Sequence, residues 1–515
     1  MSPRAQDLPY DIWEYITTFL PSAETKKLLD VNHALFDIAM NERYRTTTVG
    51  SLIQKETSRT LARLTDPEVA SRVHKLIFKP GDICRAILAQ KNAKRKTIAS
   101  DTPKNEIKIR SIVKGSLLRQ RMETPVDVHP PLIPADVAVT DILVAMKLLT
   151  GLTSLLVDIN TSEHWYFHQA NIPFFTIGWP TFRTSLQSLE LRVPVEDLAL
   201  ILPKETLSNL EAVSFWVIRA SISAQEDTIV VETILPFLQS HRLTLRSLTL
   251  DVAERTNLSP LLSELQLPFL TYFKLSQPYF EQGVADYTGL QRFFKRHRSS
   301  LLRLDIVVGH PSALSASQPY PFFSQECFSI SLPHLEHLAI DYNFSDLYGG
   351  GVLRDAVINY IHRCKSTLTS LTLGSSQTWT LNSAKLLVEG FISTARLRRL
   401  EISVVFFESE LLTVLAANLP NLEILKISML NISPQGDEYN SRIGSRVPLF
   451  ATEIATLFFP QWRLKNLNLQ VTGAGPSAVH AVYYLERDEC KAALLMALPN
   501  VEVFCGFGRE EYYSL

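Results

Sequence analysis

The stretches SLQSLELRV (residues 185–193) and TLRSLTLDV (residues 244–252) share one pattern of apolar positions. In each, an apolar residue is followed by two variable residues, a second apolar residue, one variable residue and a third apolar residue. The last two apolar positions alternate as on a β-strand with one buried face, while the first turns inward from the preceding loop. This pattern decides the fold, because it recurs along most of the chain.

The pattern occurs in nine clear copies and four weaker ones. The clear copies are Leu186-Leu189-Leu191, Leu245-Leu248-Leu250, Leu270-Phe273-Leu275, Leu301-Leu304-Ile306, Leu335-Leu338-Ile340, Leu368-Leu371-Leu373, Leu397-Leu400-Ile402, Leu422-Leu425-Ile427 and Leu464-Leu467-Leu469. The weaker copies are Val73-Leu76-Phe78, Leu152-Leu155-Val157, Leu210-Val213-Phe215 and Val501-Phe504. From Leu186 onward most neighbouring copies are 24 to 37 residues apart, with one step of 42.

Segments with helical spacing lie between these strands. One set of apolar residues follows the i, i+3, i+4, i+7, i+10 rule, and two shorter sets do the same. They are Val139, Ile142, Leu143, Met146 and Leu149, then Leu290, Phe293 and Phe294, then Leu411, Leu412 and Leu415. A strand, loop and helix at this period bury their apolar faces only by stacking on neighbouring units. We therefore expect an α/β solenoid with parallel strands on the concave face, and a conventional α/β domain with leucine-rich strands is the alternative.

The repeats resemble leucine-rich repeats over residues 70–510. That family usually places Asn or Cys three residues after the third apolar position. Here the place holds Ala253, Pro278, Gly309, Ser376, Val405 or Thr472, and only Asn343 fits. We therefore expect a solenoid with irregular curvature.

Residues 8–45 read LPYDIWEYITTFLPSAETKKLLDVNHALFDIAMNERYR and differ from the repeats. Ile12, Ile16, Phe19 and Leu20 share one face of a short helix, with Pro9 before it and Pro21 after it. Two further apolar clusters follow, first Leu28, Leu29 and Val31, then Leu35, Phe36, Ile38 and Ala39. Three short helices of this size cannot bury a core of their own, so they should expose apolar surface until a partner or the repeats cover it.

The spacing of these residues is similar to the F-box, in particular to the N-terminal F-box of fungal proteins in which degenerate leucine-rich repeats follow. The similarity lies in Leu8-Pro9, the acid at Asp11, Phe19-Leu20-Pro21, the later leucine pair and Val31-Asn32. Thr25, His33 and Phe36 depart from the residue types usual in that family. The resemblance implies a three-helix F-box domain at 5–48, followed by the solenoid at 70–510.

The resemblance also implies a function. F-box domains dock on a Skp-type adaptor and through it on a cullin–RING ubiquitin ligase of the SCF type. The residues that would make the adaptor contact are Leu8, Pro9, Ile12, Ile16, Leu20, Leu28, Leu29 and Val31. The chain would then be a non-catalytic receptor whose repeats bind a target protein. The alternative is a repeat-only interaction scaffold whose N-terminal helices cap the solenoid; exposure of Leu8 and Pro9 distinguishes the two, since a cap buries them.

A basic stretch interrupts the repeats at 91–134. Residues 91–122 carry ten basic residues against two acids, Asp101 and Glu106, and the proline-rich TPVDVHPPLIP follows. We interpret this stretch as a solvated insertion. A nuclear-import signal around Lys94, Arg95 and Lys96 and a phosphate-binding patch remain alternatives.

Composition places the protein in the cytoplasm, the nucleus or both. Hydrophobic residues make up 46% of the 515 residues and charged residues 20%, which is ordinary for a globular chain. The 51 basic residues nearly cancel the 52 acidic ones, so we do not expect nucleic-acid binding. No apolar leader and no long apolar run is present, and five scattered cysteines suggest reduced thiols. We expect no membrane association, and a monomer outside the ligase complex.

Catalytic motifs are absent from the sequence, which has no HExxH, GxSxG or Walker A pattern. The run from Gly473 to Ala478 matches GxGxxA but has a proline at its fourth position, and Gly349-Gly350-Gly351 has no lysine in P-loop register. Two histidine pairs, His164 with His168 and His334 with His337, have no third ligand nearby beyond an adjacent glutamate. We therefore expect no enzyme activity, no cofactor and no metal.

Overall fold

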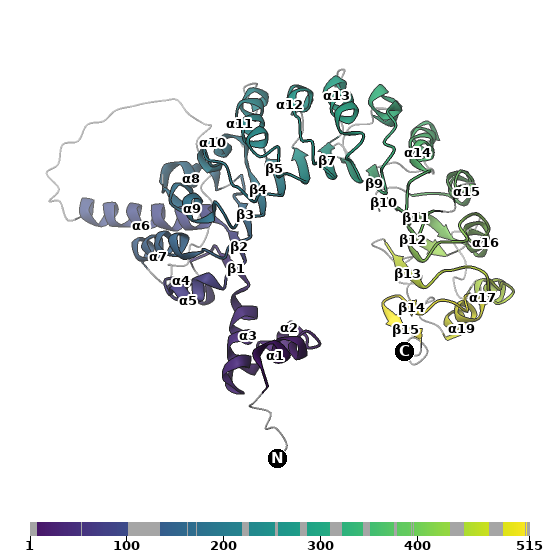
Figure 1. The fold of residues 1–515 in the computed structure, drawn as a ribbon, viewed down its shortest axis with the longest axis horizontal. Helices are drawn as coiled ribbons and strands as arrows, with labels where there is room; N and C mark the ends of the chain where they lie inside the picture. The colour runs from purple at the N-terminus through teal and green to yellow at the C-terminus, as the bar shows by residue number, and fades with distance from the viewer. Residues whose placement is uncertain are drawn as a thin grey trace, which may run out of the picture. The chain divides into compact units, whose positions relative to one another are not determined.

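The structure of the 515-residue chain is a computed structural model. It describes residues 8–52, 54–161, 163–170, 172–218, 226–252, 256–278, 286–309, 322–342, 351–374, 378–392, 394, 396–432, 447–472, 488–509 and 511, except for 101–133. The chain divides into two compact units, Met1–Thr244 and Leu245–Leu515. Each unit alternates strands with helices, and the helices lie along one face of its sheet (Figure 1).

The first unit begins with short helices and then alternates. Its strands are β1 (Thr46–Val49), β2 (Lys75–Phe78), β3 (Ser154–Asp158), β4 (Ser188–Pro194) and β5 (Ala212–Ile218). Its α-helices are α1 (Tyr10–Thr17), α2 (Ser22–Thr25), α3 (His33–Tyr44), α4 (Lys55–Leu64), α5 (Pro67–Ser71), α6 (Pro80–Ser100), α7 (Ala135–Leu148), α8 (His164–Ala170), α9 (Phe174–Phe182), α10 (Leu198–Ile201) and α11 (Glu226–Ser240). Two 3₁₀ turns, η2 (Leu28–Asp30) and η3 (Val195–Asp197), complete it.

The second unit continues the same alternation. Its strands are β6 (Ser247–Val252), β7 (Tyr272–Pro278), β8 (Arg303–Gly309), β9 (His337–Tyr342), β10 (Ser370–Leu373), β11 (Arg399–Phe407), β12 (Ile424–Ile432), β13 (Asn466–Val471), β14 (Val503–Phe504) and β15 (Phe507–Gly508). Its helices are α12 (Ser259–Glu264), α13 (Thr288–His297), α14 (Gly351–Cys364), α15 (Leu381–Glu389), α16 (Ser409–Asn418), α17 (Val447–Ala455) and α19 (Asp488–Ala497), with the 3₁₀ turns η4 (Phe322–Ser324) and η5 (Glu326–Ser329).

Neighbouring strands pair in parallel and in sequence order within each unit, as predicted. Leu338, Leu371 and Leu400 stand directly beside one another on β9, β10 and β11. Only β14 and β15 pair antiparallel among the described strands. Long helical crossovers make this arrangement possible, because parallel strands cannot be joined by a tight turn. The mixed α/β class with a mostly parallel open sheet is therefore confirmed, and its strand order is that of a solenoid.

The repeated apolar positions form the core. Every residue of the nine clear copies is at most about one-tenth exposed, and most are fully buried. The alternating positions Thr249, Ala339, Thr372, Glu401 and Lys426 are half-buried, as expected for the sheet face that carries no helix. The helical sets predicted from spacing fall in α7, α13 and α16, apart from Leu149, which follows α7. Most of their residues are buried, whereas Val139 and Leu143 are half-buried.

Successive repeats are also joined by a backbone ladder that the family pattern did not predict. The carbonyl oxygen of Glu336 accepts hydrogen bonds from the amides of Thr369 and Ser370, and that of Thr369 accepts from Arg398 and Arg399. The same arrangement recurs before the other parallel strands, for example at Arg398 O. These bonds lie just before the strands, at the opposite end from the place where the family usually has Asn.

Three local features differ from expectation. An additional strand, β1, pairs with β2 before residue 70, where the array was expected to begin. The basic stretch starts inside a helix, because α6 continues to Ser100; residues 101–133 lie outside the described residues. The first helix ends at Thr17 rather than continuing through Phe19 and Leu20, which lie in the turn that follows. None of the described helices is both long and apolar enough to cross a membrane.

Candidate functional site

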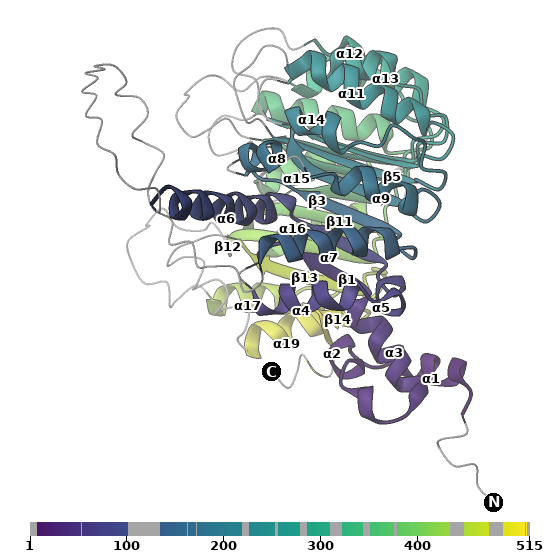
Figure 2. The same cartoon turned by 90° about the vertical axis from the view of Figure 1, so that its left-hand side faces the viewer.

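The N-terminal helices project from the β1 end of the first unit's sheet (Figures 1 and 2). Pro9 stands at the N-cap of α1 and Asp11 lies in the first turn, where a negative charge interacts favourably with the helix dipole. The second apolar cluster forms the turn η2, and Asn32 caps α3 by accepting a hydrogen bond from the amide of Leu35 at 2.8 Å. Residues 8–45 thus form short helices as predicted, although η2 is a 3₁₀ turn.

The apolar side chains of α1, η2 and their flanks are exposed. Leu8 is 37% exposed and Val31 58% exposed, and Ile12, Ile16 and Leu20 each lie near 40%. Pro9 is exposed too, while Leu28 and Leu29 are half-buried. All eight residues predicted to contact an adaptor therefore keep accessible surface. Tyr15 and Phe19, which were not among them, extend the patch and meet edge to face with their ring centres 5.0 Å apart.

Helix α3 behaves differently from α1. Leu35, Ile38, Ala39 and Tyr44 are buried, and α3 contacts α1, α2, η2 and β1. The helix therefore holds the short helices together and joins them to the first strand. The apolar surface that remains exposed belongs mainly to α1, η2 and the segments beside them, together with Phe36 of α3, which is 41% exposed.

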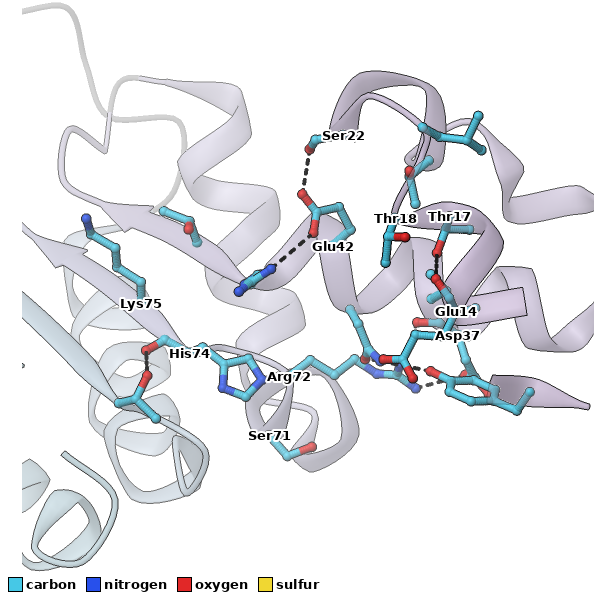
Figure 3. Close-up of a pocket in the computed structure, with 18 of the residues that line it drawn as sticks. Glu14, Thr17, Thr18, Ser22, Asp37, Glu42, Ser71, Arg72, His74 and Lys75 are labelled. Carbon is cyan, nitrogen blue, oxygen red and sulfur yellow. Dashed lines mark hydrogen bonds and ion pairs between the residues drawn. The ribbon is translucent and has the colours of Figure 1, made fainter. Parts of the chain in front are cut away.

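A polar groove of about 1170 Å³ separates the N-terminal helices from the first repeats (Figure 3). Arg72, which follows α5, bridges it by donating hydrogen bonds to the carboxylate and backbone oxygens of Asp37 and to Asn41 Oδ1, at 2.6–3.1 Å. Ser22 donates to Glu42 on the other side, at 2.6 Å. Because polar side chains line this junction, the exposed apolar side chains of α1 are not used to seal the array.

The helix-free sheet face carries paired charges and aromatic rings. In the first unit the guanidinium of Arg192 lies 4.6 Å from the ring centre of Trp216 and contacts Glu190 at 2.7 Å. These side chains stand on neighbouring strands, β4 and β5. Such a mixture of an aromatic ring and arginine is typical of surfaces that bind proteins.

The same kind of surface occurs in the second unit. Arg303 lies over the ring of Tyr272 at 4.7 Å, and both contact Asp305, at 3.0 and 2.8 Å. Burial and the Asp305 charge raise the pKa of Tyr272 above its usual value. Further along, Glu401 accepts a hydrogen bond from Lys426 at 2.6 Å. The side chains of this face are thus fixed by their neighbours before any partner binds.

A second cluster of polar side chains lies between α8 and η3 in the first unit. Asp197, which is 0% exposed, meets His164 Nδ1 at 2.9 Å and His168 Nε2 at 2.7 Å. The histidine pair was visible in the sequence, but Asp197 was missed because it lies 33 residues from His164. The approach of Asp197 follows from stacking of successive repeats, which sequence spacing within one helix does not reveal.

Acidic residues surround this cluster. Glu163 hydrogen-bonds Asp82 at the start of α6, and burial followed by the Asp82 charge raises the pKa of Glu163 to about 7. A Cβ at Gly81 would lie 2.5 Å from Glu163 Cβ, so only glycine allows this approach of α6 and α8. Burial, with the charges of Asp197 and Glu163, raises the pKa of the Cys84 thiol to about 12. Cys84 is therefore an unreactive thiol.

Among the described residues, the other sequence candidates do not gather into a cluster. His334 and His337 are both exposed, and Gly351 begins α14. Residues 473–478, Gly349 and Gly350 lie outside the described residues. No family model matches the chain, and a search of curated proteins finds no significant match. The resemblance to F-box and leucine-rich-repeat proteins therefore stays a prediction.

Proposed function

We propose that this chain is the non-catalytic target receptor of an SCF-type cullin–RING ubiquitin ligase. Its N-terminal helices dock on a Skp-type adaptor, and the helix-free sheet face binds a target protein. The observation that carries the proposal is the exposed apolar patch of α1, η2 and their flanks, at the positions that the F-box resemblance assigns to the adaptor. Exposed Leu8 and Pro9 favour a receptor over a cap.

Covering an apolar patch of this kind with a partner stabilises the complex by about 25 cal/mol per Å² of apolar surface removed from water. Its aromatic and branched side chains suit an interface core, from which charged residues are depleted. Arg72 and α3 anchor the segment to the first repeats, so a docked adaptor is attached through α3 to the sheet.

The sheet face supports the second half of the proposal. Arginines held by ion pairs and rings held by cation–π contacts with them, as at Trp216 and Tyr272, lose little conformational freedom on binding. Both charge signs occur on this face, which suits a protein partner better than a nucleic acid.

The adaptor contact is tested by the double substitution Leu8→Ala with Pro9→Ala. Buried apolar anchors at an interface typically contribute about 1–4 kcal/mol each, so capture of a purified Skp-type adaptor should fall at least about tenfold. The matched control is Pro268→Ala with Phe269→Ala, another exposed pair of a proline and a large apolar residue, far along the chain. The control should bind the adaptor as the wild type does.

Two results contradict this proposal. If the Leu8 and Pro9 variant captures the adaptor as well as the wild type does, the assignment of these residues to the contact is wrong. If the wild-type chain binds no Skp-type adaptor, the proposed function is wrong.

A repeat-only scaffold with a capping N-terminus is the second candidate. It is favoured by the buried face of α3 and by the hydrogen bonds of Arg72. A cap depends on packing, so the Leu8 and Pro9 substitutions would then lower the free energy of unfolding. In a receptor they leave it within about 0.5 kcal/mol, as exposed substitutions do.

A further inference from the structure

The cluster of His164, His168 and Asp197 has the composition and geometry of a transition-metal site. One ligand atom from each residue lies within 4.8 Å of the other two, and no other such group of His, Cys, Asp or Glu occurs among the described residues. In a tetrahedral zinc site with bonds of about 2.0 Å, neighbouring ligand atoms lie about 3.3 Å apart. Asp197 Oδ2 lies 2.9 Å from His164 Nδ1 and Asp197 Oδ1 lies 2.7 Å from His168 Nε2, so each imidazole meets the carboxylate at a separation about half an ångström shorter than in such a site.

The burial of Asp197 provides a second, independent observation. Asp197 immediately precedes α10, yet its side chain makes no capping hydrogen bond. Its Oδ1 atom is buried and does not meet hydrogen-bond geometry with any described partner, although His168 Nε2 lies 2.7 Å away. A carboxylate without solvent and without a full set of hydrogen bonds is costly, and a coordinated cation removes that cost.

The surrounding charges also favour a cation. The carboxyl groups of Asp82, Glu163 and Glu196 interact with this cluster or its immediate neighbours, and Arg85 balances Asp82 at 2.5 Å. Two imidazoles with one carboxylate suit zinc and related first-row ions, whereas magnesium and calcium prefer all-oxygen ligands.

We propose that His164, His168 and Asp197 bind one Zn²⁺ ion that fastens α8 to η3. These elements belong to successive repeats, since α8 follows β3 and η3 follows β4. His168 is 41% exposed, so water reaches the cluster and supplies the fourth ligand. The ion would join two repeats through side chains that otherwise meet through ion pairs and one hydrogen bond. This inference is independent of the adaptor-binding function.

The test uses the purified full-length chain after chelator treatment and dialysis. Equilibrium dialysis against Zn²⁺ should give one tightly bound ion per chain, and Co²⁺ should produce the visible absorption of a tetrahedral site. His168→Gln and Asp197→Asn should each weaken Zn²⁺ binding by at least about 100-fold, because each removes a direct ligand. Mg²⁺ and Ca²⁺ should not compete.

The matched control is His334→Gln with His337→Gln, which removes the other histidine pair and should leave one tight site. Circular dichroism checks that each variant is folded, and His168→Gln is the safer variant because His168 is partly exposed. Zn²⁺ binding without a tetrahedral Co²⁺ spectrum, equal affinity in His168→Gln and wild type, or loss of the site in the His334 and His337 control would each overturn the proposal.

Discussion

At the scale of single residues, Leu371 and Thr372 show how one strand divides its surface between core and solvent. Leu371 is fully buried between Leu338 and Leu400, whereas its neighbour Thr372 lies half-buried on the helix-free face. Both stand on β10, so they share backbone geometry and position in the array. The difference between them is therefore one of packing alone.

This difference predicts unequal effects of alanine. Leu371→Ala should lower the free energy of unfolding by about 2–5 kcal/mol, because the close-packed core leaves a cavity. Thr372→Ala is the matched control and should change it by less than about 0.5 kcal/mol. Denaturant unfolding of both variants measures the two values, and comparable losses would contradict the assignment of the faces.

At the scale of secondary-structure elements, two helices end in the same histidine arrangement. At the end of α11, His241 Nε2 accepts a hydrogen bond from the amide of Leu207 at 2.9 Å, and Nδ1 donates to Phe237 O at 2.7 Å. At the end of α13, His297 repeats this with Leu267 and Phe293, at 3.0 and 2.8 Å. The amide can only donate, so each ring is neutral with its hydrogen on Nδ1. Each ring ties a helix to the loop of the preceding repeat.

These histidines predict a pH dependence. Burial lowers the pKa of both rings below 6.5, although the backbone hydrogen bonds partly oppose this. The unfolded chain therefore binds protons before the folded chain as the pH falls. The stability that the neutral rings contribute is present above pH 6.5 and is lost as the pH falls through their folded pKa values.

Thermal unfolding at pH 7.5 and pH 5 measures this loss. The decrease between the two values should be larger in the wild type than in a variant with His241→Gln and His297→Gln. Glu163 acts in the opposite direction, because its raised pKa stabilises the folded state at low pH. The Glu163 contribution is the same in the wild type and the variant, so it cancels when the two are compared. If the variant loses as much stability between pH 7.5 and pH 5 as the wild type, the two histidines are not the source of the loss.

The elements themselves were mostly predictable from apolar spacing. Leu338, Leu371 and Leu400 are large, apolar and periodic, and burial selects such residues directly. Strand β1 was missed because its sequence TTTV has only one large apolar residue. The other inward position holds Thr47, whose buried hydroxyl donates a hydrogen bond to the backbone oxygen of Tyr44. Asp197 was missed because repeat stacking, and not local sequence, brings it to the histidines.

At the scale of the whole molecule, each unit is an array in which a strand contacts only the strands before and after it. In such arrays stability depends on each repeat and on its nearest neighbours. In Leu245–Leu515 the longest pairing is between β11 and β12, which match at eight register positions, and the shortest strands are β14 and β15 at the end. Stability within this unit should therefore be uneven.

Native-state hydrogen exchange should show this unevenness. Amides of β11 and β12 should exchange most slowly in the unit, and those of β14 and β15 most rapidly, because the last strands open without disturbing the others. Exchange measured strand by strand at neutral pH tests the order. Equal protection of β12 and β14 would mean that the unit opens only as a whole.

The segment between β8 and β9 has a consequence for how such a protein can change over generations. Its described residues form two 3₁₀ turns packed around Phe322, Phe323 and Phe328, where neighbouring repeats carry α-helices. The strands on either side remain in register. The described outer part of this repeat thus packs differently from that of its neighbours while the inner strand keeps its partners. Repeats in such a chain can therefore vary on their outer surface and on their sheet face separately, so a change on the sheet face need not disturb the packing that holds the array together.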